Sequence, residues 1–266
     1  MSREIAILID GGFLTKRLSR IVANPEKLTP TKVVALVRAM CKEHVHRLTD
    51  DDSSNWHRHV YRIFFYDAPP FEGQAHHPLT GKQINYAKSD QAAFQRELFD
   101  LLRKQRNVAL RLGHLSKLSG WALQSEQLVK LLRARTLMEN IAALEAQPDG
   151  SIVLPADLAA DAAKQAEHWS QLQDWMVRLD LRQKGVDMRI GLDIASITLK
   201  RLASTIILVA GDADFVPAAK LARREGLQFI LDPLWQSVSD DLFEHIDGLK
   251  TALKKPDHLK NPKDPA

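Results

Sequence analysis

The chain has 266 residues, of which 45% are hydrophobic and 26% are charged, and its formal net charge is +4. This composition is typical of a globular protein, and the length suits one large α/β domain or one domain with an insertion. The single cysteine, Cys41, excludes an internal disulfide and a cysteine-based zinc cluster, and we expect it to be a packed side chain. The mild positive charge permits a polyanionic partner without requiring one.

Hydropathy gives no sign of a membrane partner. No apolar run reaches the roughly 20 residues that a membrane-spanning helix needs. The first residues lack the charged and apolar pattern of a signal peptide. We therefore expect a cytoplasmic protein.

The first part of the chain alternates short apolar runs with segments whose apolar residues recur at helical spacing. Strands are predicted over residues 4–9, 60–66 and 108–113, and helices over residues 31–48 and 90–103. The intervening residues 71–86 predict a loop, since they follow two prolines and contain further glycine and proline residues.

The pattern changes in the middle of the chain. Residues 121–181 are rich in Leu, Ala, Gln and Glu and predict helices, with an apolar stripe that contains Trp169 and Trp175 and continues to Leu179. We interpret this stretch as a helical insertion in an α/β domain. It could cover a neighbouring cleft, or pair two subunits of a homodimer through the Trp169 and Trp175 face.

The alternation of strands and helices resumes after the insertion. A short extended segment is predicted over residues 186–192 and a helix from Asp193 to about Leu202. Then come a strand over residues 205–210, a helix over 217–225 and a strand over 227–231. Such alternation indicates an α/β fold, a doubly wound parallel sheet with helices on both faces. We expect one domain over residues 1–253, with the insertion at about 120–182 and a disordered tail over 254–266.

Acidic residues follow several of the predicted strands. Asp10 and Asp212 each come after an apolar run, and Asp67 ends the second strand. Parallel strands end at the same edge of a sheet, where open α/β sheets bind ligands. Two carboxylates about 4 Å apart repel by roughly 4 kcal/mol at an effective dielectric of about 20. A proton or a divalent cation would relieve this repulsion, and oxygen ligands suit Mg²⁺ or Mn²⁺.

Three further acids fall near the same predicted edge. Asp214 lies at the start of the helix after Asp212, Asp193 at the predicted start of another helix, and Asp187 shortly before it. Each also has an ordinary structural explanation, as a helix cap or a solvated loop residue. Asp10 and Asp212 are harder to explain in that way, because four or more apolar strand residues precede each.

Several of these motifs resemble the NYN domains of the PIN-like nuclease superfamily, in the LabA-like bacterial branch. They lie over residues 3–114 and 183–247. The matching pieces are Ile9-Asp10-Gly11-Gly12, Phe65-Tyr66-Asp67-Ala68-Pro69-Pro70, Lys88-Ser89, Lys184-Gly185-Val186-Asp187 through Leu192-Asp193, and Gly211-Asp212-Ala213-Asp214-Phe215-Val216-Pro217. Each piece alone is weak, but in this order they are fairly specific.

The resemblance implies a doubly wound parallel sheet and metal-dependent cleavage of RNA phosphodiesters. It implies metal-site acids at Asp10, Asp193, Asp212 and Asp214, with Asp187 nearby. One position departs from the family pattern. Many NYN domains carry an asparagine three residues after the first aspartate, where this chain has Phe13.

The first hypothesis is a nuclease that uses Mg²⁺ or Mn²⁺ and acts on RNA in preference to DNA. Its catalytic acids would be those named for the metal site, with Asp187 as a further metal ligand. The predicted substrate-binding residues are Lys88, Lys184, Arg189 and Asp67. The alternative is a non-catalytic module that binds RNA or protein on the same fold, which the insertion and Phe13 favour. A phosphohydrolase of the haloacid-dehalogenase type is disfavoured, because Gly12 occupies the place of its second acid.

Overall fold

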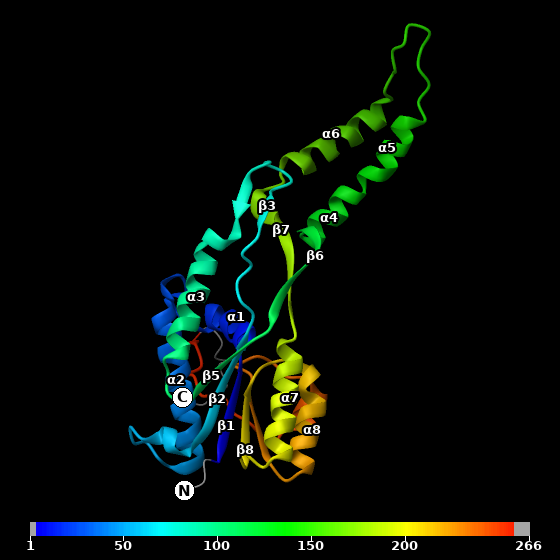
Figure 1. Ribbon diagram of the computed structural model, residues 1–266. Coiled ribbons are helices and arrows are strands. Elements are labelled where there is room, and N and C mark those ends of the chain that lie inside the picture. Colours follow the sequence, from blue (N-terminus) through cyan, green and yellow to red (C-terminus); the bar gives the residue numbers. More distant parts are fainter. Residues whose placement is uncertain (1–3, 258–266) are drawn as a thin grey trace. The chain divides into compact units, whose positions relative to one another are not determined.

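The computed structural model describes residues 4–257, apart from the side chains at 118 and 119, and divides the chain into two compact units (Figure 1). Unit 1 comprises the chain up to Gly73, Tyr86–Ser116, and the chain from Gln183 onward. Unit 2 comprises Gln74–Asn85 and Lys117–Arg182. None of the described helices is long and apolar enough to cross a membrane.

A six-stranded parallel sheet forms the centre of unit 1. In spatial order its strands are β10 (Gly248–Leu249), β9 (Gln228–Asp232), β8 (Thr205–Val209), β1 (Ile5–Asp10), β2 (Val60–Asp67) and β5 (Val108–Leu112). Every neighbouring pair is parallel, and Ile9 lies opposite Phe65 on one side and Val209 on the other. The chain winds outward from β1 in one direction and from β8 in the other. The predicted doubly wound parallel sheet is therefore confirmed, with its topological switch point between β1 and β8.

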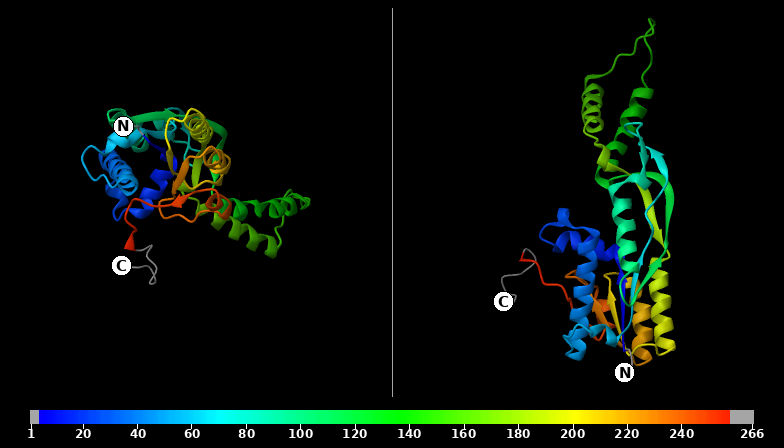
Figure 2. Two further views of the ribbon diagram at one scale, coloured as in Figure 1. Left: turned by 90° about the horizontal axis from the view of Figure 1, so that it is seen from below. Right: turned by 60° about the vertical axis from the view of Figure 1, so that its left-hand side comes forward.

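Helices cover both faces of this sheet, as Figure 2 shows for unit 1. One face packs against α1 (Gly11–Ile21), α2 (Pro30–Thr49) and α3 (Asp90–Arg103), and the other against α7 (Val186–Leu199), α8 (Val216–Arg224) and α9 (Asp240–Glu244). Alternate residues of β1 serve the two layers, because successive side chains of a strand point to opposite faces. Ile7 and Ile9 join the first layer and Leu8 joins the second. Cys41 is buried in the first layer, which confirms the packed side chain predicted there.

Unit 2 is built from small elements. They are the antiparallel pair β3 (Gln74–His76) and β4 (Gln83–Asn85), and the helices α4 (Ser125–Leu132), α5 (Ala134–Ala142) and α6 (Ala156–Ser170). The strands β6 (His114–Leu123) and β7 (Val177–Lys184) form a separate two-stranded sheet, and the chain passes between the two units along them.

Short 3-10 helices occur in both units. Unit 1 contains η1 (Pro25–Lys27), η2 (Trp56–His59), η3 (Tyr86–Lys88) and η5 (Ala213–Phe215), and unit 2 contains η4 (Asp174–Met176).

Three predicted segments differ in the structure. The predicted loop at 71–86 contains the hairpin of β3 and β4, whose turn includes Gly81 at a φ of +68°. The helical stretch predicted over 121–181 begins and ends in strands, so its apolar stripe is divided among α6, η4 and β7. Strand pairing, which a single segment does not reveal, overrode the helical spacing.

The predicted extended segment at 186–192 is helical. Helix α7 begins at Val186, directly after Gly185, whose φ of +77° is the left-handed conformation that glycine adopts readily. Val186, Ile190, Ile194 and Ile197 recur at helical spacing and are buried on the sheet. Asp193 is consequently a residue in the middle of a helix and not the first one. The disorder predicted for 254–266 concerns a segment of which residues 258–266 lie outside the described part of the chain.

Candidate active site

Asp10 and Asp212 lie on either side of the switch point. Asp10 is the last residue of β1, and Asp212 follows the end of the neighbouring strand β8 by three residues. Each carboxylate also caps the helical turn after it. Asp10 Oδ1 accepts a hydrogen bond from the Phe13 N–H (3.0 Å), and Asp212 Oδ1 accepts one from the Asp214 N–H (3.1 Å). The two aspartates are thereby anchored at the sheet edge where α/β folds bind ligands.

Asp187, in the first turn of α7, joins these acids electrostatically. Burial raises the pKa of Asp10 above the usual value of an aspartate, the Phe13 N–H opposes this, and the negative charge of Asp187 raises it further. Partial desolvation likewise raises the pKa of Asp187, and the charges of Asp212 and Asp214 add to the rise. Asp10, Asp187, Asp212 and Asp214 therefore form one electrostatic group, which we call the acidic cluster.

The acidic cluster offers donors that fit a hard divalent cation. All four are carboxylates, the ligand type that Mg²⁺ and Mn²⁺ prefer. Within residues 4–257 the one trio of potential ligand atoms lying within 4.8 Å of one another belongs to Asp241, Glu244 and His245, away from the cluster in the sequence. No three carboxylates of the acidic cluster meet this distance. Mg²⁺ usually keeps several waters and takes only one or two carboxylates directly, so it does not require three converging ligands.

Asp193 has different surroundings. It follows Asp187 by six residues in α7, which corresponds to about 9 Å along the helix axis. Its Oδ2 accepts a hydrogen bond from the Tyr66 hydroxyl (2.8 Å) and lies 3.4 Å from Arg111 Nε. Burial raises the pKa of the Tyr66 hydroxyl, and the negative charge of Asp193 adds to the rise, so the tyrosine remains a donor. The structure brings Asp193 to Tyr66 and Arg111 and not to the acidic cluster.

Asp67 is enclosed beside the cluster. It is only 4% exposed, and its Oδ1 accepts hydrogen bonds from Gln183 Nε2 (2.6 Å), the Ala68 N–H (2.7 Å) and Gln95 Nε2 (3.3 Å). Burial raises the pKa of Asp67 to about 6 against these hydrogen bonds, and the charge of Asp10 adds to the rise. A side chain so enclosed can orient its neighbours but has little surface with which to contact a substrate.

The family model of the NYN domain matches residues 124–247. The match covers slightly less than half of the chain, which over these residues is similar to NYN domains. NYN domains are part of the PIN-like nuclease superfamily, so the match points to nuclease-type activity and to nucleic acid as the ligand. PIN-like nucleases typically use divalent metals. No curated protein and no solved structure matches the chain.

The residues that match the NYN model include only part of the acidic cluster. The match contains Asp187, Asp212 and Asp214, while Asp10 lies before its first residue. It ends at residue 247, where the motif resemblance in the sequence also ends. It begins at residue 124, inside the segment interpreted as an insertion.

Phe13 lies against Gly211, which is among the residues that match the NYN model. A Cβ atom placed on Gly211 would lie 2.5 Å from the Phe13 ring and 2.6 Å from Gln236 Nε2. Any larger residue than glycine would therefore displace one of these side chains. Where many NYN domains have an asparagine, this chain has an aromatic ring against the residue that precedes Asp212.

The basic side chains predicted to bind substrate lie in unit 1, on three different elements. The predicted substrate-binding residues Lys88, Lys184 and Arg189 are all exposed, at the end of η3, at the end of β7 and in the first part of α7. Lys16 was not predicted, although its positive charge lowers the pKa of Asp10. The sequence did not point to Lys16 because helix α1, which carries it, begins with two glycines and was not predicted.

Proposed function

We propose that this chain is a nuclease that hydrolyses phosphodiester bonds of RNA with the help of Mg²⁺ or Mn²⁺. The observation that carries the proposal is the acidic cluster. Its carboxylates come from β1, from α7 and from the turn after β8, at the switch point of a parallel sheet. The charge of Asp187 disfavours ionisation of Asp10, and the charges of Asp212 and Asp214 disfavour ionisation of Asp187. The NYN domain match supports the reaction class.

The charge of the cluster explains why a cation is required. Asp187, Asp212 and Asp214 are exposed, so three carboxylates face solvent where a phosphate would approach, and like charges repel. A bound divalent cation supplies Lewis acidity and lowers the pKa of a water molecule that it holds. Asp10 and Asp212 are the fixed members of the ligand set, because each also caps a helical turn.

The neighbouring residues have supporting roles in this proposal. Lys16, Lys184 and Arg189 neutralise phosphates that flank the cleaved bond. Asp67 and its two glutamine partners keep the ends of β2 and β7 in position beside Asp10. Asp193 acts as a positioning residue through Tyr66 and Arg111. The preference for RNA over DNA rests on the resemblance to NYN domains.

Two variants of one helix test the proposal. Asp187→Asn removes a charge from the acidic cluster, whereas Asp193→Asn removes the same charge about 9 Å farther along α7. We expect Asp187→Asn to lower Mn²⁺-dependent cleavage of a labelled single-stranded RNA at least about 100-fold, as the loss of an electrostatic catalytic group does. Asp193→Asn should stay within about tenfold of the unchanged chain.

The assay is repeated with Mg²⁺, with EDTA and with DNA of the same sequence, and circular dichroism verifies the fold of both variants. Cleavage that persists in EDTA, or full activity of Asp187→Asn, would contradict the proposal. Equal losses in the two variants would mean that Asp193 belongs to the ligand set that the resemblance implies.

A binding module without catalysis is the second candidate. Phe13 favours it, and so does the exposure of apolar side chains on α4–α6, since such surfaces often bind a partner. In that case the unchanged chain would bind the labelled RNA, or a protein, without turnover in any of these conditions.

A further inference from the structure

A cavity of about 280 Å³ opens in unit 1 where the chain leaves β9. Trp235, Gln236, Thr251 and Lys255 are among the residues that line it. The chain reaches it directly from Asp232, the last residue of β9. The cavity therefore lies at the carboxyl edge of the sheet, the same edge as the acidic cluster.

A hydrogen bond joins a side chain that lines the cavity to the backbone at the switch point. β9 pairs with β8, and Asp232 lies opposite Val209. Gln236 Nε2 donates a hydrogen bond to the carbonyl oxygen of Gly211 (3.4 Å), the residue directly before Asp212. Trp235 is thus adjacent in sequence to a side chain that contacts the backbone of the candidate active site.

The turn that carries Trp235 is held in a costly conformation. Leu234 has a φ of +46° and Trp235 a φ of +62°, in the left-handed region that non-glycine residues rarely adopt. Such strain persists only where the surroundings fix it, and it is concentrated at functional sites. Here the buried Arg17 donates two hydrogen bonds to the Leu234 carbonyl oxygen, from Nε (3.0 Å) and from Nη2 (2.7 Å).

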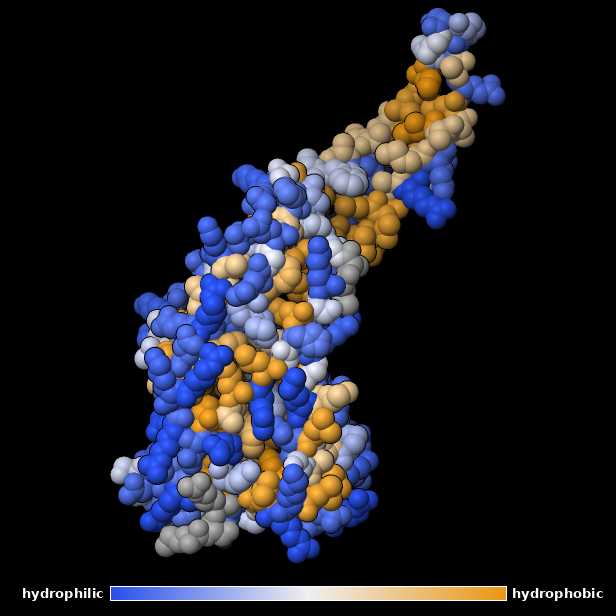
Figure 3. Space-filling view, in the orientation of Figure 1, coloured by the Kyte–Doolittle hydropathy of each residue, from blue (hydrophilic) through white to orange (hydrophobic). Residues whose placement is uncertain are grey.

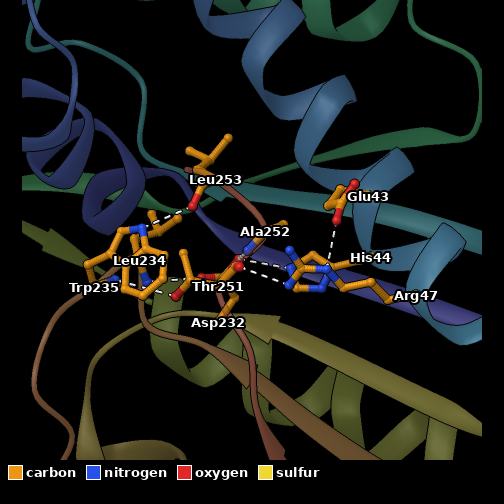
Figure 4. A network of polar contacts seen from close by, with 9 residues as sticks. All are labelled: Glu43, His44, Arg47, Asp232, Leu234, Trp235, Thr251, Ala252 and Leu253. Atoms are coloured by element: carbon orange, nitrogen blue, oxygen red, sulfur yellow. Dashed lines mark hydrogen bonds and ion pairs between the residues drawn. The ribbon is translucent and has the colours of Figure 1, made fainter. Parts of the chain in front are cut away.

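A buried carboxylate also holds this turn (Figure 4). Asp232 is 0% exposed, and its Oδ1 accepts a hydrogen bond from the Leu234 N–H (2.9 Å). Its Oδ2 lies 2.8 Å from His44 Nε2 and accepts a hydrogen bond from the Ala252 N–H (3.1 Å). The turn is therefore connected to helix α2 and to the chain after β10.

These contacts present a rigid aromatic ring to solvent. Trp235 remains 36% exposed, although its indole N–H donates a hydrogen bond to the Leu253 carbonyl oxygen (3.0 Å). Lys255 Nζ lies over one face of the indole ring, 5.5 Å from its centre. Proteins that bind single-stranded nucleic acids combine aromatic rings, on which the bases stack, with cations that contact the phosphates. A ring already fixed in place loses little entropy when a base stacks on it.

We infer that Trp235 and Lys255 form a stacking subsite for an unpaired nucleobase. The position of that base, next to the nucleotide whose phosphate reaches the acidic cluster, rests on the proposed function. Stacking itself needs no metal. Because a paired base is already stacked in its duplex, the subsite selects single strands over duplexes.

The experiment uses the full chain and a fluorescein-labelled single-stranded 12-nucleotide RNA. In EDTA, fluorescence anisotropy should show that Trp235→Ala weakens binding about tenfold, in the range known for loss of one stacked base. Trp235→Phe, which keeps a ring, should recover most of the affinity. Trp175→Ala, at a tryptophan that is 67% exposed in unit 2, is the matched control and should bind like the unchanged chain. Binding of a blunt RNA duplex should change less than about twofold in all variants.

A second measurement does not depend on the alanine variant folding. The single strand should quench the tryptophan emission of the unchanged chain, and Trp235→Phe should lose that quenching. In Mn²⁺, Trp235→Ala should raise KM about tenfold and leave kcat within about twofold, as expected for a group that contributes only to binding. Unchanged affinity in Trp235→Ala together with unchanged quenching in Trp235→Phe would overturn the subsite, while Asp187→Asn would still test the nuclease. If the unchanged chain never cleaves RNA but loses affinity in Trp235→Ala, the proposed function fails and the subsite stands.

Discussion

The two units of the molecule treat their apolar side chains in opposite ways. In unit 1 the strand residues Ile7, Leu8 and Leu208 are 0% exposed and lie between two layers of helices. In the described part of unit 2, the buried side chains are Ala134, Leu137, Leu179 and His77. Leu132 in α4, by contrast, is 62% exposed, and Figure 3 shows apolar surface over α4–α6.

This difference indicates where the stability of the chain resides. Buried apolar surface is the main favourable term in folding, at about 25 cal/mol per Å². Helices of the length of α4 and α5 are marginal without packing. Their i,i+4 ion pairs, Lys130 with Glu126 and Arg135 with Glu139, contribute only about 0.3–0.5 kcal/mol each. We therefore expect unit 2 to open at a lower free energy than unit 1.

The sharpest test of the comparison replaces one leucine in each unit. Leu208→Ala in β8 should lower the free energy of unfolding by about 2–5 kcal/mol, because it removes fully buried methyl groups and leaves a cavity. Leu132→Ala should change it by no more than about 0.5 kcal/mol, since the side chain is mostly in water already. Urea denaturation followed by circular dichroism measures both. Equal losses in the two variants would show that α4 is packed as firmly as the central sheet.

Unit 1 also buries a carboxyl group, and this predicts a pH dependence. Burial raises the pKa of Asp67 from 3.8 to about 6. The folded chain therefore binds this proton more tightly than the unfolded chain, and the stability contributed by Asp67 falls as the pH rises from about 4 to about 6. Asp67→Asn cannot ionise and should remove this loss, which gives a gain of at most about 3 kcal/mol at pH 8 and little at pH 4.

An exposed aspartate of unit 2 provides the control. Asp161→Asn in α6 removes the same charge at an exposed position, so it should change the free energy of unfolding by no more than about 0.5 kcal/mol. Denaturation at several pH values between 4 and 8 compares the variants. If Asp67→Asn gave the same gain at every pH, the effect would come from packing and not from ionisation.

The sequence was sufficient to predict five strands of the sheet in unit 1, because these strands are short, apolar and bounded by turn residues; the two-residue strand β10 was not predicted. The runs that became β1 and β8 are buried on both faces and need no alternation. The boundaries of unit 2 were harder to predict from the sequence. The pairing of β6 with β7 depends on a partner distant in the chain, and local helical spacing pointed the other way. The strands β3 and β4 are close in the chain, but each has only three residues and the glycines and prolines around them predicted a loop.

The acids of the candidate site divide in a similar way. Asp10 and Asp212 could be recognised because each interrupts an apolar pattern at the end of a strand. Asp187 and Asp193 could not be ranked, since their positions depend on where α7 begins, and that is set by the left-handed Gly185. Trp235 had no signal at all, because no sequence pattern announces a left-handed turn at a tryptophan.

The smallest expected effect separates the two units most directly. His77 is the buried histidine of unit 2, and its Nδ1 accepts a hydrogen bond from the Leu79 N–H (3.3 Å). Its Nε2 therefore carries the proton and donates to the Asp174 carbonyl oxygen (3.1 Å). His77→Ala should lower the free energy of local opening around β3 and η4 by about 1 kcal/mol, the typical worth of such a bond. The neighbouring exposed His76, replaced in the same way, should have no effect.

Native-state hydrogen exchange resolves this change by residue. Amides of β3, β4 and η4 should exchange roughly fivefold faster in His77→Ala, as about 1 kcal/mol implies. Amides of β1 and β8 should keep the rates of the unchanged chain, because a local opening of unit 2 does not require the central sheet to unfold. Faster exchange in β1 as well would mean that both units open together, and the contrast between a stable unit 1 and an independently opening unit 2 would no longer hold.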